Sequence, residues 1–79
     1  MRAEDILIWN RAVPFVPYRI RMNSGRTFDV RHPEMIRVTR TTAFLFTFTG
    51  EPTDPSERVE MIGLLLIESV EPIPASAAA

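Results

Sequence analysis

The chain contains a single histidine, His32, which is the first side chain to consider for acid–base chemistry. Glu34 lies two residues further on and is the nearest candidate for a catalytic partner, with Pro33 between them. One histidine without any cysteine cannot supply an ordinary zinc site, and the three glycines lie too far apart for a phosphate-binding loop. We therefore interpret residues 32–34 as an exposed turn, and we expect no enzymatic activity, metal site or cofactor.

Arginine offers more chemistry, since all nine basic residues are Arg and none is Lys. Guanidinium groups beside aromatic rings are a common means of holding single-stranded nucleic acid. Such a face is predicted near Phe15 and Tyr18, and its candidate nucleic-acid-binding residues are Arg19, Arg21, Arg31 and Arg37. The alternative is that Arg19 pairs with Asp29 and that the other arginines are simply solvated.

The charges are divided unevenly along the chain. Eight of the nine arginines lie in residues 1–40, whereas six of the ten acidic residues lie in residues 41–79. The acidic second half would repel a phosphate backbone. It could instead meet the Arg-rich face of a neighbouring copy, which would give head-to-tail charge complementarity.

Period-two patterning places the arginines of residues 19–31 on a β-hairpin. Apolar residues alternate with charged ones on both sides of a loop at residues 23–25. A three-residue loop with Gly25 in the left-handed conformation fits a type I turn followed by a bulge. A slip by one residue would destroy the matches between the two strands. The predicted opposite pairs are Tyr18–Val30, Arg19–Asp29 and Ile20–Phe28.

The other segments predict a mostly β fold. A short helix is expected over about residues 3–11, because apolar residues recur at roughly helical spacing before Pro14. Further strands are predicted at residues 35–39, 43–49 and 67–71, with extended structure at 59–62 and a polar loop at 50–58. In the fourth strand, the side chains expected to face the core are Phe44, Phe46 and Phe48. The expected architecture is a short N-terminal helix followed by a five-stranded, strongly bent small barrel.

One domain is expected over residues 1–72, with a disordered tail at residues 73–79. A chain of 79 residues buries a modest fraction of its surface, so oligomerisation is the expected supplement to its stability. No apolar run is long enough to span a membrane, and we expect a cytoplasmic protein without membrane contact. Residues 62–67 are apolar on both faces, which predicts a subunit interface at Leu64, Leu65 and Leu66.

The order of helix, hairpin, two strands, polar loop and closing strand resembles the Sm-like fold. The best local match is to the bacterial Sm-like RNA chaperones. Residues 20–28 resemble the first Sm motif, which is an alternating strand, a glycine turn and a second apolar strand. Residues 66–72 resemble the closing strand of that family. The chain is also similar to a group of short uncharacterised bacterial proteins through residues 14–18, 25–26 and 30–34. The first resemblance implies an Sm-like, SH3-like small barrel.

The chain departs from the Sm-like pattern in two places. RNA-binding Sm proteins usually carry an asparagine after a methionine at the third strand, and here Ile36 follows Met35. The RNA chaperones carry a Lys-His pair before the closing strand, and here those positions are Leu64 and Leu65. We therefore expect a non-enzymatic, homo-oligomeric Sm-like assembly or protein-binding module. The alternative is an RNA-binding ring that uses the Arg-rich strand face.

Overall fold

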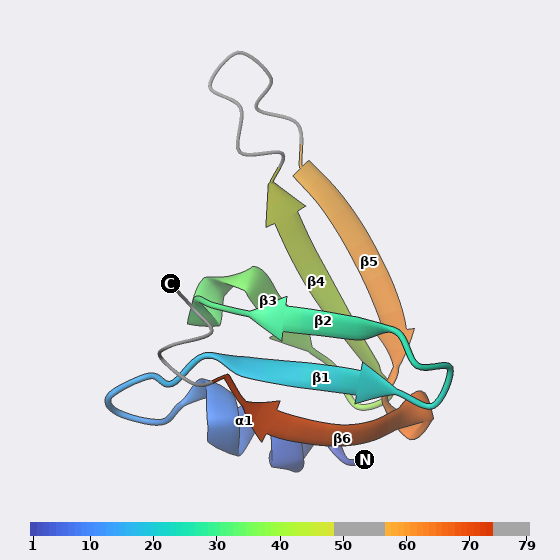
Figure 1. Ribbon diagram of the computed structural model, residues 1–79, viewed down its shortest axis with the longest axis horizontal. Helices are drawn as coiled ribbons and strands as arrows, with labels where there is room; N and C mark the ends of the chain where they lie inside the picture. The colour runs from blue at the N-terminus through green and yellow to red at the C-terminus, as the bar shows by residue number, and fades with distance from the viewer. Residues whose placement is uncertain (49–56, 74–79) are drawn as a thin grey trace.

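The computed structural model describes residues 1–48 and 57–73 (Figure 1). In chain order, the elements are α1 (Ala3–Asn10), β1 (Tyr18–Met22), β2 (Thr27–Val30), the 3₁₀ turn η1 (Pro33–Met35), β3 (Ile36–Val38), β4 (Thr42–Phe48), β5 (Glu57–Gly63), the 3₁₀ turn η2 (Leu64–Leu66) and β6 (Ile67–Pro72). The strands of this described part form two three-stranded antiparallel sheets, ordered β2-β1-β6 and β3-β4-β5.

The predicted β class and N-terminal helix are confirmed, but the predicted strand count and closure are not. The described residues form six strands rather than five, and their two sheets do not close into a barrel. The extended backbone is interrupted between β2 and β3 by η1, where Pro33 has a fixed φ and no N–H to donate to a neighbouring strand. β5 also begins earlier than expected, at Glu57.

The β1–β2 hairpin has the predicted register. Tyr18 lies opposite Val30, Arg19 opposite Asp29 and Ile20 opposite Phe28. The loop is closed by the N–H of Met22, which donates to the carbonyl of Arg26 at 2.8 Å, and by the N–H of Gly25, which donates to the carbonyl of Met22 at 2.9 Å. Gly25 has a φ of 93°, in the left-handed region where residues with a Cβ atom are strained.

Helix α1 is anchored to the first strand. Its Ile6 is fully buried in the core. The hydroxyl of Tyr18 donates to Oδ1 of Asn10 at 3.1 Å, which ties the end of α1 to β1. Burial raises the pKa of Tyr18 to about 12, because the charged phenolate would lose its hydration there. Figure 1 shows α1 below β1 and partly behind β6 in this view.

The core is continuous across the two sheets and α1. Its buried side chains include Ile6, Tyr18, Ile20, Met22, Val30, Ile36, Ala43, Leu45, Ile62, Leu64 and Ile67. The outward-facing residues of β1 alternate with the buried ones, which is the pattern of a sheet covered on one side only.

The predicted core face of β4 is wrong. Ala43 and Leu45 are buried, whereas Phe44 and Phe46 are half-buried and lie on the other face; the side chain of Phe48 lies outside the described part. The neighbouring strands decide this orientation, because Ala43 lies opposite both Val38 and Ile62, and Leu45 lies opposite Ile36. Opposite residues of adjacent strands share a face, so burying Ile36 and Ile62 turns the phenylalanines outward.

Ile73, the first residue of the predicted tail, is the last residue that the structure describes. Ile73 is buried, and its N–H donates to the carbonyl of Pro17 at 2.9 Å, so it belongs to the folded unit rather than to a tail. The rest of the predicted tail, residues 74–79, lies outside the described residues, as does most of the predicted loop, residues 50–56. Within the part of the chain that the structure describes, no helix has both the length and the apolar character needed to cross a membrane.

Candidate interaction surface

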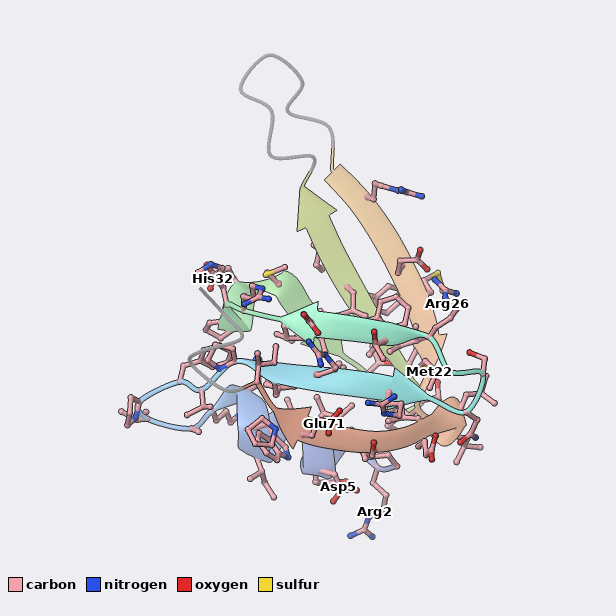
Figure 2. All side chains as sticks on the ribbon, viewed as in Figure 1. Arg2, Asp5, Met22, Arg26, His32 and Glu71 are labelled. Carbon is pink, nitrogen blue, oxygen red and sulfur yellow. The ribbon has the colours of Figure 1, made fainter. Side chains whose placement is uncertain are left out.

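The outer face of the β2-β1-β6 sheet is a network of paired charges. Arg19 Nε donates to Asp29 Oδ1 at 2.7 Å, which confirms the predicted pair. Arg31 also donates to Asp29, at 3.4 Å. Arg21 donates to Glu71 of β6 at 2.9 Å, a contact that the sequence reasoning did not predict. Figure 2 shows Glu71 on β6, beside β1. Three of the four candidate nucleic-acid-binding arginines therefore already have carboxylate partners.

The charged network also affects the pKa of Asp29. The hydrogen bond from Arg19 lowers the pKa of the Asp29 carboxyl below its ordinary value, and the positive charges of Arg19 and Arg31 act in the same direction. Partial burial opposes the shift but does not overcome it. A carboxylate held in this way makes the Arg face less available to a phosphate backbone.

Arg37, the fourth candidate, lies on the other sheet. It is exposed on β3 and lies opposite Phe44 of β4. The structure therefore gathers Arg19, Arg21 and Arg31 on one face and places Arg37 on another. This distribution does not form the single Arg-rich face that the sequence predicts.

The outward face of the β3-β4-β5 sheet carries a cluster of apolar side chains, which we call the apolar outer face: Phe44, Phe46, Val59 and Met61. Phe44 lies opposite Met61, and Phe46 lies opposite Val59, so the four occupy neighbouring positions on two strands. Met61 is 67% exposed and Val59 is 52% exposed. A contiguous apolar patch on a small domain is typical of an interaction site.

The three leucines of η2 divide between the core and the surface. Leu64 is only 1% exposed and lies in the core, so the expectation that it contributes to a subunit interface is revised. Leu65 and Leu66 are 86% and 58% exposed, and both remain available to a partner. Leu66 lines the same hollow as Met61 of β5, so exposed apolar side chains of β5 and η2 meet there.

A hollow of about 220 Å³ lies between the β1–β2 turn and the end of β5. Its lining includes Met22, Phe28, Met61 and Leu66. Arg26 forms one edge, with its guanidinium 5.0 Å from the centre of the Phe28 ring and 3.4 Å from the carboxylate of Glu60 (Figure 2). The hollow is smaller than the roughly 300 Å³ at which small-molecule sites begin.

The His32 side chain is exposed at the end of β2, close to the start of η1 (Figure 2). Glu34 is also exposed, and the structure records no hydrogen bond or ion pair between these two side chains. Within residues 1–48 and 57–73, no group of His, Asp and Glu side chains is arranged to hold a metal ion.

The apolar outer face is the feature that sequence reasoning missed. The signal that could have revealed it is the pairing of β4 with β3 and β5, in which Ile36, Val38 and Ile62 face inward.

Comparison of the chain with protein families, with curated proteins and with solved structures finds no match.

Proposed function

We propose that this chain is a non-enzymatic assembly module that forms homo-oligomers, with a second copy of the chain as its partner. The observation that carries the proposal is the apolar outer face. Four apolar side chains gather there outside the core, and two of them are more than half exposed. Association would remove part of this apolar area from water, which is the main favourable contribution to most protein–protein binding.

The small size of the domain supports the same proposal. A domain of 79 residues has a limited core, and its described residues contain no disulfide or metal site to supplement it. Pairing with a second copy stabilises such a fold by mass action. Self-association therefore suits both the surface and the energetics of this chain.

The proposal includes an Sm-like relationship for the fold. Its support is the order of the elements, which is a helix, a hairpin, two strands, β5 and the closing strand β6. The pairing of β6 with β1 brings the first and last strands of that order together. Because η1 interrupts the extended structure between β2 and β3, this would be a variant of the Sm-like fold with two sheets rather than one continuously bent sheet.

The alternative of an RNA-binding ring has less support. Arg19, Arg21 and Arg31 are paired with carboxylates, and Arg37 lies apart from them. RNA binding through arginines should weaken steeply as salt rises. Because three of these arginines are already paired, fluorescent oligo-U and oligo-A titrated over a salt series should show no salt-sensitive binding. Salt-sensitive binding would favour the alternative.

Light scattering coupled to size-exclusion chromatography tests the assembly proposal. The wild-type mass should exceed the 9.0 kDa of one chain. Val59→Lys should shift the mass toward that of a single chain, because it places a charge in the apolar outer face. Ile8→Lys is the matched control, since Ile8 is an exposed apolar residue on α1, and it should leave the wild-type mass unchanged.

Circular dichroism should show that both lysine variants keep the wild-type fold, because both positions are exposed. A wild-type protein that has the mass of one chain throughout would contradict the proposal. A Val59→Lys variant that associates as well as wild type would also contradict it.

A further inference from the structure

The strand edge best placed to join another copy is that of β5. Among the described residues, each sheet has two edge strands, β2 and β6 in one and β3 and β5 in the other. β5 is the longest of the four, with seven residues. Figure 1 shows β4 and β5 extending past the β2-β1-β6 sheet, with β5 at the outer margin of the molecule. Unpaired N–H and C=O groups along such an edge form a template for another strand.

The side chains of β5 alternate between two different environments. Glu60 lies opposite the buried Leu45 and contacts Arg26 of the β1–β2 turn, so Glu60 and Arg58, two residues away, share the inner face. Val59 and Met61 lie on the apolar outer face. Over residues 58–61, the strand therefore presents one base and one acid on one face and two apolar side chains on the other.

We propose that two copies of this chain join by antiparallel pairing of their β5 strands about a two-fold axis at Val59, which deepens the proposed homo-oligomeric function and rests on it. In this register, Val59 lies opposite Val59 of the partner subunit. Arg58 lies opposite Glu60 of the partner subunit, and the symmetry repeats this pair on the other side of the axis. A continuous six-stranded sheet results.

Charge selects this register over its neighbours. An axis one residue later, at Glu60, would place two glutamates directly opposite each other, which is unfavourable. Charged residues on an edge strand ordinarily discourage pairing with another chain. Here the positive Arg58 and the negative Glu60 lie two residues apart on the strand. The two-fold symmetry therefore places each of them opposite a residue of the other charge, which gives two ion pairs between the subunits.

The other edges fit a second copy less well. β2 and β3 are short, with four and three residues. β6 carries Glu68 and Glu71 but no basic residue, and it ends at Pro72, which has no N–H to donate. A β6 edge could accept Arg58 but would repel Glu60. Self-pairing of β5 satisfies both charges.

Cysteine cross-linking tests the register directly, because the natural chain contains no cysteine. Opposite residues of antiparallel strands have Cα atoms about 4.5–5.5 Å apart, within the range that a disulfide spans. Val59→Cys should therefore form a disulfide-linked dimer rapidly under mild oxidation.

Met61→Cys is the matched control for cross-linking, being on the same strand and face and more exposed. In the proposed register, the two copies of position 61 are four residues apart along the strands, about 13 Å, which is too far for a disulfide. Efficient cross-linking of Met61→Cys with little of Val59→Cys would overturn the register.

Charge reversal provides a second test that does not depend on a disulfide. Arg58→Glu and Glu60→Arg should each weaken dimerisation roughly tenfold, because each creates like-charged opposite pairs. The double variant restores opposite charges and should recover most of the wild-type affinity. A double variant no better than either single variant would contradict the pairing. A wild-type monomer would contradict the proposed function itself, whereas a wild-type oligomer without cross-linking at position 59 would contradict only this interface.

Discussion

Asp29 receives hydrogen bonds from two arginines and organises the charged face of the β2-β1-β6 sheet. The Arg19–Asp29 contact could be predicted from sequence, because the loop fixes the hairpin register and the residues oppose each other. The Arg21–Glu71 contact could not. It joins residues far apart in the chain and depends on how β6 docks beside β1, where the register shifts between Arg21 and Met22.

The lowered pKa of Asp29 predicts how stability depends on pH. A carboxyl whose pKa is lower in the folded state stabilises the fold above its ordinary pKa of about 3.9. This contribution is lost as the pH falls through the pKa of the folded state. Asp29→Asn should therefore be less stable than wild type at neutral pH, and chemical denaturation should show the difference shrinking in acid. A difference that is constant across pH would contradict this account.

Replacement of Arg19 tests the cause of the Asp29 shift. Arg19→Gln should raise the pKa of Asp29 toward its ordinary value, measured by NMR titration of the carboxyl carbon, because the largest contribution comes from the Arg19 hydrogen bond. Arg21→Gln is the control, since Arg21 pairs with Glu71, and it should leave the Asp29 titration unchanged. Equal shifts in both variants would show that the general charge of the face, rather than the hydrogen bond, sets this pKa.

At the scale of the elements, the hairpin was predictable and the orientation of β4 was not. The register of the hairpin is determined by local features of the sequence, which are the alternation of apolar and polar residues in its strands and the loop around Gly25. In β4, alternation identifies two possible faces but does not say which is buried. Phe44 and Phe46 are the more hydrophobic set, yet the pairing with β3 and β5 places Ala43 and Leu45 inward.

The orientation of β4 and β5 predicts opposite consequences for two truncations. Leu45→Ala should lower the free energy of unfolding by about 2–5 kcal/mol, because it leaves a cavity in the core. Met61→Ala should change it by only about 0.5 kcal/mol, because that side chain is mostly exposed. Urea denaturation at low protein concentration measures both. A larger loss for Met61→Ala than for Leu45→Ala would reverse the assignment of the faces.

The turn of the hairpin provides a second prediction at this scale. Gly25→Ala should destabilise the protein by about 1–2 kcal/mol, because a Cβ atom is strained at its φ of 93° even though the space around it is open. Ser24→Ala, in the same exposed loop, should cost much less, since its hydroxyl accepts only a long contact of 3.4 Å from the N–H of Arg26. Equal losses in thermal denaturation would mean that backbone strain does not govern this turn.

For the whole molecule, the sequence predicted an excess of apolar surface but misplaced part of it. It assigned the interface to Leu64, Leu65 and Leu66, of which Leu64 lies in the core. The apolar outer face was hidden because a one-dimensional pattern does not show which side of a sheet a neighbouring sheet covers. Self-association through β5 connects the exposed apolar side chains, the long edge and the alternating charges in one account.

Sedimentation velocity of the wild-type chain, over a series from low to high micromolar concentration, tests that account most directly. The account predicts a species with twice the 9.0 kDa mass of one chain, whose share rises with concentration. A single species with the mass of one chain at every concentration would contradict it.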